Sequence, residues 1–291
     1  MPTAKASLAT VEAELDHLQT ITTEQPRPLR RALGAILPPT LFVLLLLGAW
    51  QAYTVIVHPR PDIAPGPGDV LQALGSEWSA GRLQQAIATS LSRGAAGFVI
   101  ALLAGTVLGL VLAEWRWLRR AVGPLISGLQ VLPSVAWVPA AIIWFGLSDA
   151  TVYFVVLMGA FPSVANGLLA GIDQVPPQLH RVGTVLGAGR WQRIWHVSLP
   201  AALPGYVAGL KQGWAFSWRS LMAAEIIAVG GSIGFGLGAL LQQSRELADL
   251  AGVLAAIITI LVIGILVELV LFAPLERRML RGRGLLSGGG R

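Results

Sequence analysis

Six long apolar runs constrain the fold of this chain more than any other feature of its sequence. A helix needs about 20 apolar residues to cross about 30 Å of hydrocarbon, and each run reaches that length. Charged residues make up only 12% of the chain, whereas about 25% is usual in soluble domains. The sequence therefore predicts an all-α integral membrane protein with six transmembrane helices, within residues 33–57, 87–113, 122–147, 151–172, 203–229 and 250–272.

The distribution of basic residues predicts how the chain crosses the membrane, because Lys and Arg gather in cytoplasmic loops. With both termini in the cytoplasm, 15 of the 21 basic residues lie in cytoplasmic segments, and four lie on the outer side: Arg60, Arg82, Arg93 and Arg245. We therefore expect a cytoplasmic amino-terminal segment (1–32), a transmembrane domain (33–272) with a cytoplasmic loop at 173–200, and a cytoplasmic tail (273–291). The first segment is predicted to be an amphipathic helix, from the spacing of Leu8, Val11, Leu15 and Leu18.

Small residues recur at every fourth position in three of the six runs. The three stripes are Gly97, Ala101, Gly105, Gly109 and Ala113; Gly159, Ser163, Gly167 and Gly171; and Ala201, Gly205, Gly209, Gly213 and Ser217. Such stripes let helix backbones approach closely in a membrane. They predict a compact bundle, and they could also form a two-fold interface between two copies of the chain.

The fifth run carries charged residues at membrane depth. At 100° per residue, Lys211, Trp214, Trp218 and Glu225 share an arc of about 60° on the side away from the stripe, with Arg219 at its margin. Because ionisable residues at this depth usually face water or a partner charge, we interpret these five residues as a pathway for an anionic or zwitterionic solute. The alternatives are a structural ion pair within the bundle, or snorkelling of Arg219 and Glu225 toward the outer surface.

The cytoplasmic stretch 173–200, here called the elbow, is too long for a tight turn. Pro176 and Pro177 favour a helix start, and the sequence Gly187-Ala188-Gly189 ends that helix. A second short helix is predicted to follow and to end at Leu199-Pro200. The elbow presents aromatic and basic side chains, which favours docking on another protein.

The elbow resembles the coupling loop of bacterial ABC importer permeases. That signature reads Glu-Ala-Ala, three residues, Gly, nine residues, Ile, any residue, Leu-Pro; Gly187, Val197, Leu199 and Pro200 match its spacing. The Glu-Ala-Ala positions hold Arg181, Val182 and Gly183 instead, a departure that concerns the docking contacts of the first helix. The resemblance implies that the ATPase is contacted by Leu179, Arg181, Val182, Leu186, Gly187, Ala188, Arg190, Trp191, Arg193, Ile194, Trp195, Val197, Leu199 and Pro200.

Further motifs resemble the permeases for taurine, aliphatic sulfonates and nitrate over about residues 58–280. They include the segments 90–93, 132–139, 144–146, 186–188, 199–204, 223–225 and 275–278. The resemblance implies a type I importer fold like that of the methionine importer, in a bacterial inner membrane. It also implies a second permease copy in a homodimer, two ATPase subunits that carry ATP and Mg, and a periplasmic or lipid-anchored solute-binding protein, with membrane lipid around the permease.

The sequence lacks the residues that other classes of function require. The chain has no Cys, no phosphate-binding lysine loop, no metal-ligand spacing among its four His, and no nucleophile–base set, so we expect no catalytic residue, no cofactor and no metal here. The net charge of +6 follows the membrane pattern rather than nucleic-acid binding. The Gly234, Gly236 and Gly238 run is interpreted as a flexible outer loop entering the membrane. An ion-coupled secondary transporter and an intramembrane enzyme are the rival functions; the first would show inverted repeats, and the second a convergent acid–base or metal set.

Overall fold

The computed structural model describes residues 28–60 and 62–282. All regular secondary structure in these residues is helical. The chain divides into two units, 1–59 and 60–291, which are described separately. The predicted amphipathic helix around Leu8–Leu18 and the end of the predicted tail lie outside the described residues.

In the first unit, α2 (Pro28–Val57) forms a helix of 30 residues. Its stretch Leu37–Val57 is long and apolar enough to cross a membrane, in agreement with the first predicted span. Large apolar side chains along it, such as Phe42, Leu45 and Ile56, form an apolar surface on this unit. Lipid or protein must therefore cover this helix.

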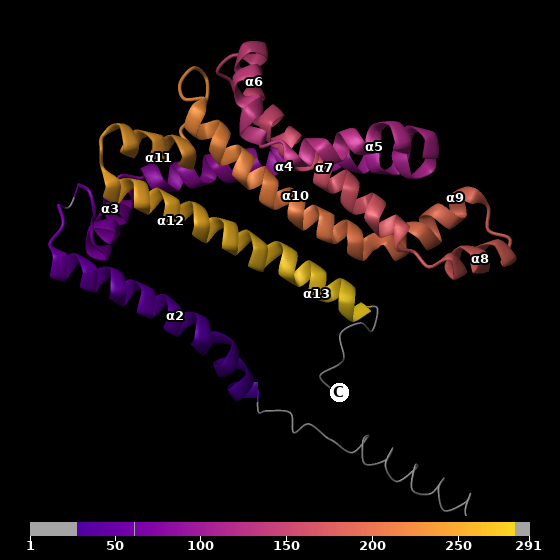
Figure 1. The fold of residues 1–291 in the computed structure, drawn as a ribbon, viewed down its shortest axis with the longest axis horizontal. Helices are drawn as coiled ribbons and strands as arrows, with labels where there is room; N and C mark the ends of the chain where they lie inside the picture. The colour runs from indigo at the N-terminus through magenta and orange to yellow at the C-terminus, as the bar shows by residue number, and fades with distance from the viewer. Residues whose placement is uncertain (1–27, 61, 283–291) are drawn as a thin grey trace, which may run out of the picture. The chain divides into compact units, whose positions relative to one another are not determined.

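The centre of the second unit is a packed set of three helices: α4 (Arg82–Glu114), α7 (Asp149–Asp173) and α10 (Leu199–Ile227). α7 lies between α4 and α10 and packs extensively on both (Figure 1). The small-residue stripes explain this packing. A Cβ atom added at Gly209 would lie 2.5 Å from Gly167 Cα, and one added at Gly205 would lie 2.5 Å from Gly171 Cα.

The stripes are therefore confirmed as close helix contacts, but the contacts are inside one chain. Gly105 of α4 approaches Val164 of α7 in the same way, with an added Cβ 2.7 Å from Val164 Cβ. A two-fold interface between copies built on these α7 and α10 glycines is ruled out, because the glycine faces are already in contact with each other.

The third predicted span is broken. α5 (Arg116–Val131) ends before Leu132-Pro133, and the 3-10 turn η1 (Ser134–Trp137) and α6 (Val138–Phe145) continue at a bend of 100°. Pro133 has no N–H to donate and disfavours a helical conformation at Leu132, whose ψ is 122°. A single straight helix over 122–147 was therefore the wrong expectation.

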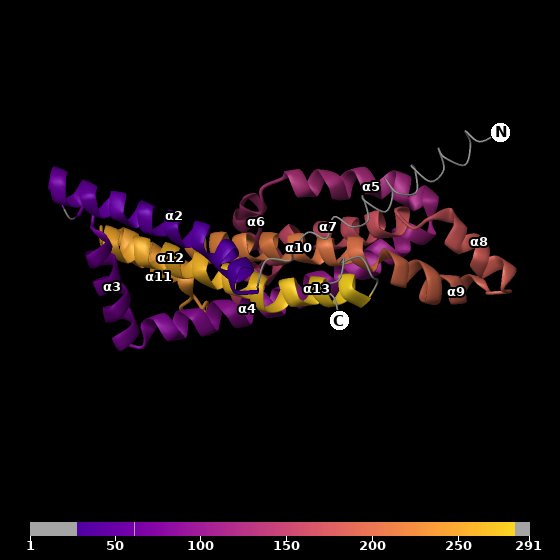
Figure 2. The same cartoon turned by 90° about the horizontal axis from the view of Figure 1, so that it is seen from below.

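The remaining helices flank the central set. α3 (Pro67–Ser79) and α11 (Leu237–Glu246) pack on α12 (Leu250–Val267), and α12 continues through the π-helical turn η3 (Glu268–Phe272) into α13 (Ala273–Gly282). At the opposite end lie α8 (Pro177–Val185) and α9 (Arg190–Arg193), as Figures 1 and 2 show.

Among the described residues, four helices are long and apolar enough to cross a membrane, or five if the bent α5–α6 pair is one span. α10 is not among them, although its 29 residues would extend about 43 Å. It carries Lys211, Arg219 and Glu225. Six crossings stay a prediction that depends on α10.

Candidate functional site

The elbow folds into two short helices joined by a glycine turn. α8 begins at Pro177 as predicted, and Gly187 closes the turn with a φ of +75°, a conformation that favours glycine. Gly183 faces the side chain of Arg193, and Arg193 Nη1 donates to Thr184 Oγ1 at 2.8 Å. The two helices of the elbow are thus held against each other.

The second elbow helix does not end at Leu199-Pro200, contrary to expectation. α9 passes through the π-helical turn η2 (Ile194–Ser198) directly into α10, which begins at Leu199. The wider π turn accommodates Pro200, which lacks an N–H and whose ring would clash with a carbonyl in a regular α-helix. The elbow is therefore continuous with the helix that carries the predicted pathway residues.

The surface of the elbow is apolar, aromatic and basic. The predicted contacts Leu186, Trp191 and Trp195 are 79%, 72% and 60% exposed, and the neighbouring Val185, which was not predicted, is 86% exposed. Among the other predicted contacts, Leu179, Arg181, Val182, Gly187, Arg190 and Pro200 are exposed, whereas Ala188, Arg193, Ile194, Val197 and Leu199 are partly buried. Exposed apolar patches of this kind mark interaction sites.

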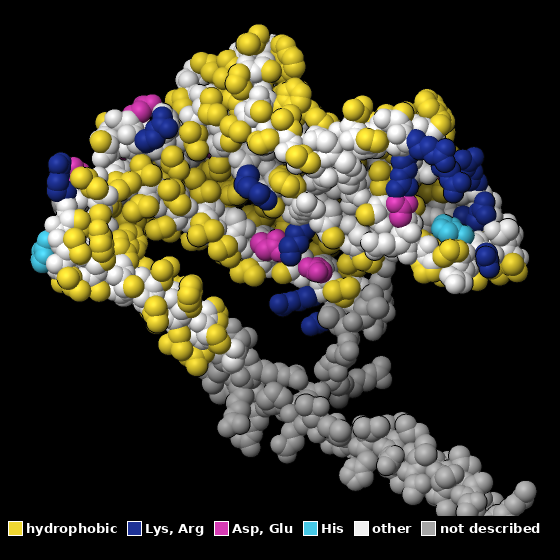
Figure 3. Space-filling model, in the orientation of Figure 1, with side chains coloured by type: hydrophobic (Ala, Val, Ile, Leu, Met, Phe, Trp, Pro, Cys, Tyr) yellow, Lys and Arg dark blue, Asp and Glu magenta, His cyan; other side chains and the backbone are white. Residues whose placement is uncertain are grey.

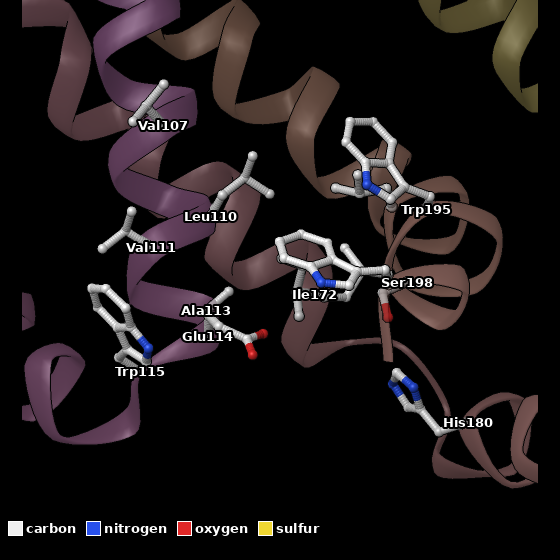
Figure 4. A pocket seen from close by; sticks show the side chains of 13 residues that line it. Val107, Leu110, Val111, Ala113, Glu114, Trp115, Ile172, His180, Trp195 and Ser198 are labelled. Carbon is white, nitrogen blue, oxygen red and sulfur yellow. The ribbon is translucent and has the colours of Figure 1, made fainter. Parts of the chain in front are cut away.

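A cavity of about 520 Å³ separates the elbow from the end of α4 (Figure 4). Val107, Leu110 and Val111 of α4 form one wall, and Ile172 and Trp195 face them. Arg190 of the elbow forms an ion pair with Glu114, at the end of α4, and so connects the elbow to the helix across this cavity.

The five predicted pathway residues lie in different environments. Trp214 and Trp218 are each 7% exposed and stack on each other, and Trp218 Nε1 donates to Ile260 O of α12 at 3.3 Å. Both indoles thus fill the space between α10 and its neighbours. Glu225 is 1% exposed.

Lys211 and Arg219, by contrast, lie on an exposed side of α10. Lys211 Nζ lies 2.5 Å from Glu268 Oε1 and 3.8 Å from Glu276 Oε2. Arg219 is exposed, stacks over the Phe216 ring and forms no ion pair among the described residues. A groove of about 520 Å³ runs beside Lys211, with Gln212 and Ala215 from α10 and Glu268, Phe272 and Glu276 opposite them.

Glu225 belongs to a buried set of contacts, here called the Arg93 network, that the sequence analysis missed. Arg93 is 4% exposed inside α4; its Nη1 lies 3.3 Å from Glu225 Oε1, and its Nη2 lies 2.7 Å from Asp149 Oδ1. Ser90 Oγ donates to Glu225 Oε2 at 2.7 Å, and Gly238 N donates to the same oxygen at 3.0 Å. Arg93 is therefore buried within α4 rather than exposed in a loop between helices.

The same network explains the Gly-x-Gly-x-Gly run. A Cβ atom added at Gly236 would lie 2.5 Å from Glu225 Oε2, and one at Gly238 would lie 2.5 Å from Glu225 Cβ. Arg93 Nη1 also donates to Gly234 O at 3.0 Å. The loop before α11 is thus packed on a buried carboxylate. A buried acid needs a partner charge. Arg93 is the one ionisable residue of the second predicted span, so the sequence could have identified it as the partner of Glu225.

Among the described residues, no group of three or more His, Asp or Glu is placed so that it could hold a metal ion. The geometry combines an exposed apolar and basic elbow, a polar side of α10 and a buried ion-pair network.

Comparison with known proteins identifies the family. Residues 67–281 match the family described as "Binding-protein-dependent transport system inner membrane component". The taurine transport system permease protein of Escherichia coli (strain K12) is 32% identical over 240 residues, which are 81% of this chain and 86% of that protein. The riboflavin transport system permease protein of Chloroflexus aurantiacus is 33% identical, over 86% of this chain and 90% of the relative.

A nitrate import permease protein of Synechococcus elongatus is 26% identical over 74% of this chain and 83% of its own length. An inward-facing structure of the MetNI methionine ABC transporter has a similar fold, with a TM-score of 0.54 at 17% identity, over 65% of this chain and 94% of that chain. The chain therefore belongs to the binding-protein-dependent transport system inner membrane components, as an ABC importer permease of the group that includes the taurine and nitrate permeases.

Proposed function

We propose that this chain moves a small anionic or zwitterionic solute, of the sulfonate, taurine or nitrate class, across the inner membrane by alternating access. Two ATPase subunits would bind and hydrolyse ATP with Mg and would dock on the elbows of two permease copies. A solute-binding protein would deliver the solute on the other side, and both termini would be cytoplasmic. The chain itself would contribute no catalytic residue.

The observation that carries this proposal is the continuity of the elbow with α10. The exposed Trp191 precedes the η2 turn and the exposed Trp195 lies within it, and Lys211 and Arg219 follow in α10 without a break in the helix. An element that is biased at one end by a partner and at the other by a solute meets the requirement for coupling between two sites.

Within α10, the exposed polar side supports a pathway lined by fewer of the predicted residues than the sequence suggested. Lys211, Gln212 and Arg219 lie on it, and charged side chains in a membrane-spanning helix face water or protein rather than lipid. Trp214, Trp218 and Glu225 would act behind this surface, by packing and by the Arg93 network.

Reconstitution tests the function against its rival. The chain is placed in proteoliposomes with its cognate ATPase and solute-binding protein, and uptake of labelled taurine, ethanesulfonate and nitrate is followed. We expect uptake of one of these solutes that requires both partners and ATP. Uptake by the chain alone, driven by an ion gradient without ATP, would instead establish a secondary transporter.

A further inference from the structure

Three arginines surround a cavity at the start of α5. The cavity, of about 440 Å³, is lined by Arg116, Arg119, Arg120 and Pro124. Arg119 Nη1 donates to Asp173 Oδ1 at 2.8 Å, and its Nη2 contacts the other carboxylate oxygen. Arg116 and Arg120 are exposed and form no ion pair among the described residues. This arginine cluster therefore keeps a local charge of about +2 after its one acid is counted.

The exposed side of α5 beyond the cluster is apolar. Trp117, Leu125 and Val131 are 71%, 67% and 83% exposed, and Pro124 is exposed beside Arg120. The opposite side is buried, because Ile126 packs with Leu112 of α4 and Leu169 of α7. At 100° per residue, Arg120, Pro124 and Val131 fall along one line of the helix.

The cluster lies at the end of a candidate membrane span. Asp173 is the last residue of α7, a helix long and apolar enough to span, so the Arg119–Asp173 pair fixes the cluster at the end of that span. The elbow begins at Asp173, and Figure 3 shows basic side chains gathered at this end of the unit. Trp117 has the amphipathic side chain that is enriched at this depth.

We propose that the arginine cluster binds the phosphate of an anionic phospholipid, whose acyl chain lies along the apolar side of α5. Guanidinium groups offer paired N–H donors that match a phosphate, and the uncompensated charge favours an anionic lipid over a neutral one. Pro124 and Val131 provide the surface that an acyl chain would cover. A soluble phosphate would leave this apolar side uncovered.

Lipid binding to the purified transporter tests the site directly. The wild-type protein is placed in phosphatidylcholine nanodiscs, and the affinity for added fluorescent phosphatidylglycerol is compared with that of R116Q/R120Q. Each basic residue near a membrane surface contributes about fivefold, so the double variant is expected to lose roughly 30-fold in affinity. R116K/R120K should keep most of the affinity, because the charges remain.

R277Q/R278Q is the matched control, since both arginines are exposed on α13 and form no ion pair among the described residues. It should bind the anionic lipid like the wild type, and thermal unfolding checks that all variants are folded. Equal lipid affinity in R116Q/R120Q and the wild type would overturn the proposal. Normal lipid binding by R116Q/R120Q together with loss of the ATPase subunit would also overturn the proposal, because the cluster would then be part of the protein interface.

Discussion

At the scale of single residues, the Arg93 network determines what Glu225 can do. The carboxylate is 1% exposed and receives contacts from Ser90, Arg93 and Gly238, so its charge is already compensated. Removing one partner of a buried pair leaves the other charge uncompensated, at a cost of about 3–5 kcal/mol. We therefore expect R93M to lower the free energy of unfolding in detergent by about that amount.

The double variant R93M/E225Q controls this prediction. It removes both charges and should be more stable than R93M alone, because no isolated carboxylate stays buried. Denaturant titration of the two variants measures the difference. If R93M were as stable as the wild type, Glu225 would have to be hydrated in the native protein and would return to the set of pathway residues.

Arg219 differs from Glu225, because no acidic side chain pairs with it among the described residues. It is exposed on α10 and stacks over Phe216. Because an anion in the pathway would meet this guanidinium, R219Q should weaken ATP-dependent uptake of an anionic solute by about tenfold, the value of one charge-assisted hydrogen bond, and R219K should restore part of it. Initial uptake rates in proteoliposomes measure the effect, and normal uptake by R219Q would assign Arg219 a structural role.

At the scale of elements, the glycine contacts between α7 and α10 predict a stability difference. A side chain at Gly209 would overlap Gly167, so G209L should separate the two helices and cost about 1–3 kcal/mol. Gly123 of α5 has nothing within 4 Å of an added Cβ, so G123A should leave the unfolding temperature unchanged or raise it. Similar unfolding temperatures for G209L and G123A would contradict the role given to the stripe.

The same elements show how much the sequence determined. The stripes, four of the six apolar runs and the start of α8 at Pro177 follow from local spacing, and the structure agrees with them. The sharp bend at Leu132-Pro133 and the π turn before Leu199 do not follow, because prolines in membrane helices are tolerated wherever neighbouring groups satisfy the freed carbonyls. Only the packed structure decides whether a proline bends, breaks or widens a helix.

The candidate site, unlike the helix boundaries, depends on contacts between segments that are distant in the sequence. The periodicity of α10 grouped Lys211, Trp214, Trp218 and Glu225 on one arc, but periodicity does not state which neighbour covers that arc. The neighbours are α4 through Arg93, α12 through Ile260 and η3 through Glu268. These partners separate buried Trp218 and Glu225 from half-exposed Lys211, a distinction that one helix alone does not contain.

At the scale of the whole second unit, α10 connects two ends with different chemistry. The elbow enters α10 through η2 without a break, and Glu225 of the Arg93 network lies near its other end, about 39 Å away at 1.5 Å per residue. The glycine contacts hold this helix closely against α7. A displacement of the elbow is therefore expected to reach Lys211, Arg219 and the loop before α11 together, rather than being absorbed at Pro200.

This connection makes the elbow tryptophans the sharpest test of coupling. Trp191 and Trp195 are largely exposed, so W191A/W195A should fold normally, whereas loss of a Trp that anchors an interface costs at least about 2 kcal/mol, roughly 30-fold in Kd. Co-purification with the ATPase and solute-stimulated ATP hydrolysis are both expected to fall. W78A removes a comparably exposed Trp from α3, at the end remote from the elbow, and should leave both measurements unchanged. An elbow variant that still retains the ATPase and its stimulation would mean that the partner contacts another surface, and that α10 is moved from elsewhere.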